Sequence, residues 1–170
     1  MENIIIRQAT REDIEEVAQL HIDSWYETYK GIISQNYLKN MKSNLNKRIE
    51  RMKNEFQLRT MIVAILNGEI VGFSEFIFSN EFSKDLDIDC ELCGLYIKNG
   101  YKNLGIGTKM FDYVTNTFRN KSKNKMGLWC IKENKPAFLF YEKKGGKIEK
   151  EKSFTIENKE YIEVAFIYEL

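Results

Sequence analysis

Residues 91–117 read ELCGLYI (91–97), KNGYKNLGIG (98–107) and TKMFDYVTNT (108–117), which are an apolar strand pattern, a loop with three glycines and the start of a helical pattern. We expect the first helical turn to contain Gly105 and Gly107. Amide N–H groups in a first helical turn have no partner within the helix, and the helix dipole adds partial positive charge at the same place. The stretch therefore predicts an anion cradle suited to a phosphate or pyrophosphate.

Composition excludes several classes of protein. The 170 residues carry 26 Lys and Arg against 25 Asp and Glu, so no basic surface indicates a nucleic-acid partner. No apolar run has the length of a membrane span, and Met1-Glu2-Asn3 does not begin a signal-peptide pattern, so we expect a cytoplasmic protein without a membrane partner. With no Gly/Ser-rich linker, residues 1–170 are predicted to form a single domain.

The three cysteines, Cys90, Cys93 and Cys130, lie within apolar runs. An odd number cannot pair fully, and no second C-x-x-C accompanies the one formed by Cys90 and Cys93. We expect reduced thiols that pack as small apolar groups, and no metal site.

The rest of the chain alternates between strand and helix patterns. The expected elements are a strand at 3–9, a helix at 11–29, one or two helices within 34–56, a hairpin of strands at 60–66 and 69–78, the strand at 90–97, the helix after Gly105, a strand at 126–131, a short helix after Asn134, and strands near 147–155 and 161–168. This order predicts an α/β fold with a mixed sheet covered by helices on both faces. The glycine loop should join two parallel strands through a right-handed crossover.

Two familiar phosphate motifs do not fit the glycine loop. A dinucleotide-binding loop needs a small residue at position 110, where this chain has Met110. A P-loop needs Lys followed by Ser or Thr after its last glycine, but Gly105 is followed by Ile106. A different phosphate-binding motif must therefore account for the loop.

What remains is Lys102 followed by Gly105 and Gly107, with Tyr101 in front. This pattern resembles the acetyl-CoA loop of the GCN5-related N-acetyltransferase family, in which Arg or Gln is followed by two residues, Gly, one residue, and Gly or Ala. Lys102 departs from that Arg or Gln, which leaves the contribution of this side chain open.

Two further stretches strengthen the resemblance. The spacing from Asn134 through Ala137 and Tyr141 to Gly145 is similar to the family's downstream motif, although Gly146 replaces an aromatic residue. The N-terminal residues Trp25, Tyr29, Gly31 and Tyr37 resemble those of bacterial members that include polyamine acetyltransferases. The likeness spans nearly the whole chain.

The resemblance implies the acyl-CoA N-acyltransferase fold, with a mostly antiparallel sheet of six to seven strands. It implies acetyl-CoA as cosubstrate and transfer of its acetyl group to a primary amine of a small molecule or peptide by direct attack. The implied cofactor-binding residues are Leu95, Tyr96, Ile97, Lys102, Asn103, Leu104, Gly105, Ile106, Gly107, Thr108 and Asn134. Acceptor contacts are expected from the first helix, at His21, Trp25 and Tyr29.

The resemblance to the family also implies catalytic roles for Glu91 and Tyr141. Glu91 would remove the proton from the acceptor ammonium, whose pKa is about 10.4 in water, and Tyr141 would protonate the departing thiolate. The alternatives are a solvent-exposed strand end for Glu91, an aromatic core position for Tyr141 and a structural role for His21. The acidic run at 81–89 is expected to be a solvated loop, with attraction of a cationic acceptor as the alternative.

Two other functions stay open. A non-catalytic CoA-binding or interaction module would keep the fold without turnover, and a nucleotide-binding protein would use the same loop. The acceptor amine and the oligomeric state are open as well, with a homodimer as one alternative.

Overall fold

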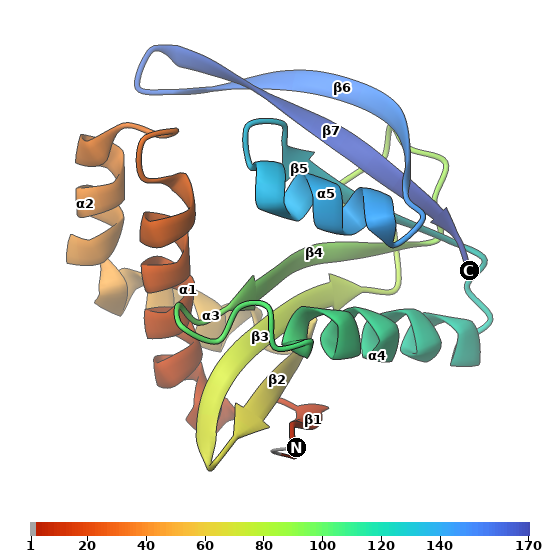
Figure 1. Ribbon diagram of the computed structural model, residues 1–170, viewed down its shortest axis with the longest axis horizontal. Coiled ribbons are helices and arrows are strands. Elements are labelled where there is room, and N and C mark those ends of the chain that lie inside the picture. The colour runs from red at the N-terminus through yellow and green to blue at the C-terminus, as the bar shows by residue number, and fades with distance from the viewer. Residues whose placement is uncertain (1–2) are drawn as a thin grey trace.

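The computed structural model describes residues 3–170, so Met1 and Glu2, on which the signal-peptide expectation partly rests, lie outside the described residues. The chain forms a seven-stranded sheet in the order β1-β2-β3-β4-β5-β7-β6 (Figure 1). All neighbouring strands are antiparallel except β4 and β5, which are parallel. The expected mixed, mostly antiparallel sheet and the parallel pair around the glycine loop are confirmed.

The elements follow the sequence pattern closely. Their bounds are β1 (Ile5–Gln8), a 3₁₀ turn (Arg11–Asp13), α1 (Ile14–Tyr29), α2 (Gln35–Ser43), α3 (Leu45–Glu55), β2 (Thr60–Leu66), β3 (Glu69–Ile77), β4 (Cys90–Ile97), α4 (Ile106–Asn120), β5 (Lys125–Ile131), α5 (Lys135–Lys143), β6 (Lys147–Ile156) and β7 (Lys159–Glu169). The stretch 34–56 thus forms two helices. Asn67 and Gly68, which join β2 to β3 in the predicted hairpin, both have positive φ, as a type I′ turn requires.

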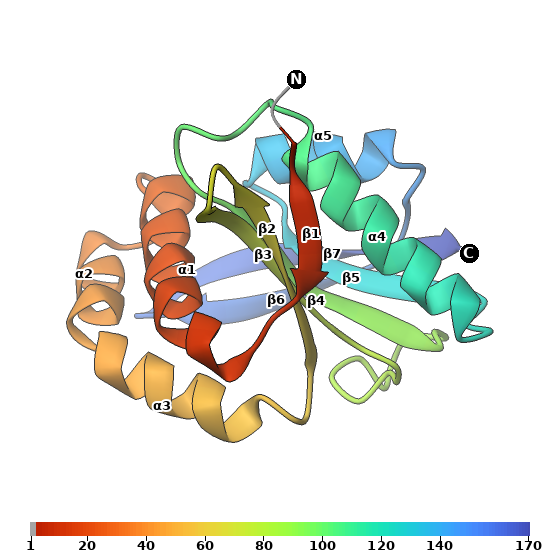
Figure 2. The ribbon, with the colours of Figure 1, turned by 90° about the horizontal axis from the view of Figure 1, so that it is seen from below.

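The helices cover the sheet on both faces. Helices α1, α2 and α3 lie on one side, and α4 and α5 lie on the other (Figure 2). The apolar face of α4 is buried, with Ile106, Met110, Val114 and Phe118 each at most 1% exposed. Among residues 3–170, no helix combines the length and apolar character that crossing a bilayer would require.

The start of α4 differs from the expectation. Gly105 precedes the helix as its N-cap, with φ +78°, so only Gly107 lies in the first turn. A left-handed backbone by itself favours glycine at position 105, with no ligand needed to explain it. Gly107 has an ordinary helical conformation, so glycine here lowers helix stability relative to alanine without any backbone requirement for it. Its presence therefore still needs another explanation.

An ion pair joins β1 to the 3₁₀ turn that precedes α1. The Arg7 guanidinium donates to both carboxylate oxygens of Asp13, at 2.6 and 2.9 Å, and the Thr10 N–H also donates to Asp13. The hydrogen bond from Arg7, above all, holds the pKa of Asp13 below its ordinary value. Since a depressed carboxyl pKa stabilises the fold only while the group is ionised, this contribution is present above the unfolded-state pKa of ~3.9 and is lost as pH falls through the folded-state pKa.

Asp13→Asn is therefore expected to lower the free energy of unfolding by about 1–2 kcal/mol at pH 7, because it removes a charged acceptor from Arg7. The difference from the parent protein should shrink as pH falls below ~4. Urea denaturation at pH 7 and pH 3 measures both, with Glu50→Gln on the exposed face of α3 as the control. An equally large difference at pH 3 would contradict the assignment.

Candidate active site

The two parallel strands separate soon after they meet. β4 and β5 are paired only at Cys90 with Met126 and at Glu91 with Gly127, although both strands continue for several residues. A bulge accompanies this separation, because Glu75 of β3 pairs with Gly94 and Phe76 pairs with Leu92, which leaves Cys93 as an extra residue. Beyond Glu91 the backbones of β4 and β5 therefore diverge, which leaves an opening in the hydrogen bonding between them (Figure 1).

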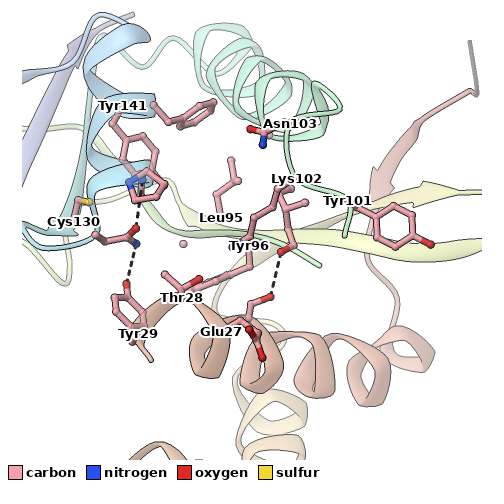
Figure 3. Close-up of a pocket in the computed structure, with 18 of the residues that line it drawn as sticks. Glu27, Thr28, Tyr29, Leu95, Tyr96, Tyr101, Lys102, Asn103, Cys130 and Tyr141 are labelled. Carbon is pink, nitrogen blue, oxygen red and sulfur yellow. Dashed lines mark hydrogen bonds between the residues drawn. The ribbon is translucent and has the colours of Figure 1, made fainter. Parts of the chain in front are cut away.

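A cavity of about 640 Å³ occupies this opening. Its walls come from α1, the second half of β4, the glycine loop with the first turn of α4, the end of β5, and α5 (Figure 3). The predicted residues that line it are Tyr29, Leu95, Tyr96, Ile97, Lys102, Asn103, Gly105, Gly107, Thr108, Asn134 and Tyr141. Residues from five separate stretches therefore meet around one space.

The glycine-loop end of the cavity fits an anion. A Cβ atom on Gly107 would come no closer than 3.8 Å to Leu95 or Phe140, so no protein atom explains the glycine there. Gly107 lines the cavity, where a ligand can approach the backbone directly. The amides of the first turn of α4 have no partner within the helix, so the pyrophosphate of a coenzyme A thioester fits this end.

Leu104 and Ile106 do not line the cavity. The Leu104 side chain is 55% exposed, and that of Ile106 is buried in the core under α4. The cofactor-binding roles predicted for Leu104 and Ile106 involve their backbone amides, and these roles stay a prediction.

Asn134 connects the two sides of the cavity. Its Oδ1 accepts the Ala137 N–H at 3.4 Å, which caps α5, and its Nδ2 donates to the Tyr29 hydroxyl at 3.5 Å. Burial, above all, raises the pKa of Tyr29, so its hydroxyl is neutral near pH 7. The pair joins α1 to α5 across the opening between the strands.

We expect Asn134→Ala to lower the free energy of unfolding by about 1 kcal/mol through loss of the helix cap. Asn134→Asp is the matched control, since aspartate also caps helices but lacks the Nδ2 donor to Tyr29. Thermal unfolding compares the two variants, and calorimetric titration measures coenzyme A binding to each. Equal destabilisation by both substitutions would show that the cap is not the stabilising contact.

Tyr141 lies on the α5 side of the cavity (Figure 3). Its ring contacts those of Phe111, Phe140 and Phe166, and the residue is 8% exposed. Burial, above all, holds the pKa of its hydroxyl well above the ordinary value of 10.0, so the group keeps its proton. A buried neutral phenol at the cavity wall is able to donate a proton there.

Glu91 is placed differently from Tyr141. It is 5% exposed, its Oε1 accepts the Ser83 hydroxyl at 2.7 Å, and its Oε2 has no hydrogen-bond partner among the described residues. Burial, above all, raises the pKa of Glu91. It does not line the cavity, so any action on a bound amine would need an intervening water.

His21 and Trp25 lie behind the cavity wall. The His21 ring is 4.9 Å from that of Tyr96 between ring centres, and Trp25 Nε1 donates to the Tyr96 hydroxyl at 3.2 Å. Burial, above all, lowers the pKa of His21 to about 3, which keeps the imidazole neutral. Of the three acceptor contacts predicted on the first helix, only Tyr29 reaches the cavity.

The structure adds residues that sequence reasoning missed. Glu27 and Thr28 of α1, Cys93 at the bulge, and Trp129 and Cys130 of β5 also line the cavity. The helical spacing of Ser24 and Thr28 was a signal for the α1 face, but no local pattern marks the residues of β5. Burial, above all, raises the pKa of both Cys93 and Cys130 to about 12, so neither thiol is an ionised nucleophile near pH 7.

The acidic run makes structural contacts. Asp89 accepts the N–H groups of Asn124 and Lys125, and Asp85 pairs with Lys150 at 2.7 Å. No residue of this run lines the cavity. Among residues 3–170, no group of three or more His, Cys, Asp or Glu side chains is arranged to hold a metal ion.

Known proteins with similar sequences are N-acetyltransferases. The sequence model described as "Acetyltransferase (GNAT) family" matches residues 14–146. The chain is 28% identical to the spermidine N(1)-acetyltransferase of Thermoplasma acidophilum, over 86% of this chain and 90% of that protein. It is 26% identical to the uncharacterized N-acetyltransferase YuaI of Bacillus subtilis, over 82% of this chain and 78% of that protein.

The fold has counterparts among solved structures. The PaiA N-acetyltransferase from Thermoplasma acidophilum, determined in complex with coenzyme A, superposes with a TM-score of 0.75 at 23% identity, over 99% of both chains. The family match covers most of the chain, and the expected fold agrees with that neighbour. The chain therefore belongs to the acetyltransferase (GNAT) family and is an N-acetyltransferase.

Proposed function

We propose that this enzyme transfers the acetyl group of acetyl-CoA to a primary amine of a small molecule or peptide by direct attack. The observation that carries the proposal is the cavity between β4 and β5, which ends at Gly107 and the free amides of α4. The pyrophosphate would bind at these amides, and the extended arm of the coenzyme would follow Leu95 to Ile97 on one side and Asn134 on the other. Lys102 and Asn103 lie at the same end of the cavity.

The chemistry follows from the groups that line the cavity. A neutral amine would attack the thioester carbonyl, the carbon–sulfur bond would break, and Tyr141 would give its proton to the thiolate. The thiols of Cys93 and Cys130 are un-ionised near neutral pH, which favours direct transfer over an acyl-enzyme. The family resemblance implies Glu91, acting through water, as one proton acceptor to test.

The acceptor is the least constrained part of the proposal. Glu27 provides a carboxylate at the α1 side of the cavity, which suits a cationic acceptor (Figure 3). The spermidine N(1)-acetyltransferase relative makes polyamines the first acceptors to test. A homodimer and a cytoplasmic location remain predictions from the sequence.

The test is release of free thiol from acetyl-CoA in the presence of polyamines, amino acids, peptides or aminoglycosides. We expect amine-dependent thiol release with at least one class. Tight coenzyme A binding without release on any acceptor would favour the non-catalytic module. A larger thermal shift with ATP or NAD than with coenzyme A would favour nucleotide binding instead.

A further inference from the structure

A second buried carboxylate lies beside the cavity. Glu75 of β3 is 8% exposed and pairs directly with Gly94, which lines the cavity next to the bulge. Directly paired residues of antiparallel strands project to the same face. Glu75 therefore shares its face with the neighbouring pair Phe73 and Tyr96, whose rings stack at 5.0 Å.

The Tyr96 side chain lies on the same face of the sheet as Glu75 and covers Gly94, the residue paired with Glu75. Its ring folds back over Gly94, where a Cβ would be 2.6 Å from Cε2 and 3.2 Å from the hydroxyl oxygen. Tyr96 also lines the cavity (Figure 3). Its hydroxyl accepts from Trp25 Nε1 at 3.2 Å, and since a phenol both accepts and donates, the hydroxyl proton is left for another acceptor.

The far side of Glu75 opens toward the surface. Glu75 lines a cavity of about 10 Å³ together with Arg48, Glu55 and Arg59, and Arg59 Nη1 is 3.7 Å from Glu75 Oε2. That volume is about what one water needs. Arg59 keeps about 20% of its side chain exposed, so this small cavity borders solvent.

Glu91 is linked to the cavity by hydrogen bonds through Ser83 and Trp129. The Ser83 hydroxyl that donates to Glu91 itself accepts from Trp129 Nε1 at 2.8 Å. Of these three hydrogen-bonded residues, Trp129 is the one that lines the cavity. An indole N–H only donates and cannot accept a proton, so this chain of hydrogen bonds does not carry a proton outward. The Tyr96 hydroxyl, on the same face as Glu75, both donates and accepts.

An acceptor ammonium has no lone pair until it loses a proton. We propose that Glu75 takes up this proton through the Tyr96 hydroxyl. The N–H bond breaks as the Tyr96 oxygen gains its proton, and the Tyr96 O–H proton moves to a Glu75 carboxylate oxygen. Tyr96 is again neutral, the amine holds a free electron pair, and protonated Glu75 later releases its proton through the cavity beside Arg59. This assignment rests on the proposed acetyl transfer.

The surroundings of Glu75 suit a proton acceptor. Burial, above all, raises its pKa, while the charges of Arg48 and Arg59 act in the opposite direction. The titratable and charged groups that face it are Arg48, Arg51 and Glu55 of α3, Arg59 before β2, and Cys93 and Tyr96 of β4. His21 of α1 contacts Tyr96 and is neutral. A carboxylate with a raised pKa is a better base near neutral pH.

The test uses Glu75→Gln, Tyr96→Phe and the double variant, with Glu55→Gln as the control that removes a carboxylate from the same arginines. The measurements are kcat/KM against pH for the best amine and the affinity for coenzyme A. Glu75→Gln and Tyr96→Phe are each expected to lower kcat/KM about 10- to 100-fold at pH 7, with affinity for coenzyme A unchanged. The loss should diminish as pH rises toward the pKa of the amine, because neutral amine then arrives from solution. The double variant should be no slower than the slower single variant, and Glu55→Gln should keep the parent profile.

Several results would overturn the proposal. If Glu75→Gln and Glu55→Gln give the same pH profile, Glu75 only neutralises the arginines. If Glu91→Gln alone removes the acid limb of the profile, Glu91 is the base. Should Glu75→Gln fail to fold, Tyr96→Phe decides, since it retains the ring, and a parent-like rate would refute the relay. Absence of thiol release by the parent enzyme with every amine would refute the acetyl transfer itself, and the relay with it.

Discussion

Gly107→Asp is expected to weaken coenzyme A binding at least ~100-fold while the protein stays folded, a loss of about 3 kcal/mol. The carboxylate would stand where the pyrophosphate is proposed to bind, so two negative charges would meet. The fold tolerates a side chain here, because a Cβ on Gly107 has only ordinary contacts at 3.8 Å. An acidic residue in a first helical turn is also favourable for the helix dipole.

The smaller substitution Gly107→Ala separates stability from binding. Alanine should raise the free energy of unfolding by up to about 1 kcal/mol through helix propensity. It should also reduce affinity for coenzyme A, since the methyl group faces the cavity. Calorimetric titration and thermal unfolding of both variants measure these effects. Parent-like binding by Gly107→Asp would place the pyrophosphate elsewhere.

Tyr141→Phe is expected to lower kcat roughly 100-fold or more, with the affinity for acetyl-CoA changed only slightly. The ring and its contacts with Phe111, Phe140 and Phe166 would remain, so only the proton donor is lost. The raised pKa keeps the hydroxyl protonated near pH 7, so the loss should persist across the neutral range.

Tyr168→Phe is the matched control for that experiment. The Tyr168 hydroxyl donates to the backbone oxygen of Tyr141 at 2.8 Å but does not line the cavity between β4 and β5. Its removal should cost about 1 kcal/mol of stability and leave kcat near the parent value. Steady-state kinetics with saturating amine compares the two variants. A parent-like kcat in Tyr141→Phe would assign the proton donor to another group.

Local patterns predicted the elements well, because they depend on neighbouring residues. The hairpin at Asn67 and Gly68 requires two positive φ values, and both are present. The apolar spacing of α4 and the Asn134 cap depend on contacts within four residues. The position of Gly105 was misjudged because a glycine pattern does not distinguish a left-handed residue before a helix from one inside its first turn.

The site was predicted less completely than the elements. The glycine loop, Asn134 and Tyr141 carry local motifs, and all three reach the cavity. Glu91 matches a family position, but the structure holds it against Ser83 and outside the cavity lining. Glu75 lies in an ordinary strand pattern, and nothing in its neighbours along the chain indicates that Gly94 and Tyr96 lie beside it.

The sequence by itself predicted the order of strands and helices, the family, and an anion cradle at the start of α4. Only the tertiary structure decided that β4 and β5 separate after Glu91, that Cys93 forms a bulge, and that Trp129 and Cys130 face the opening. The reason is physical. Periodicity and turn chemistry are set by residues a few positions apart, whereas the pairing and separation of strands depend on packing between segments distant in the chain.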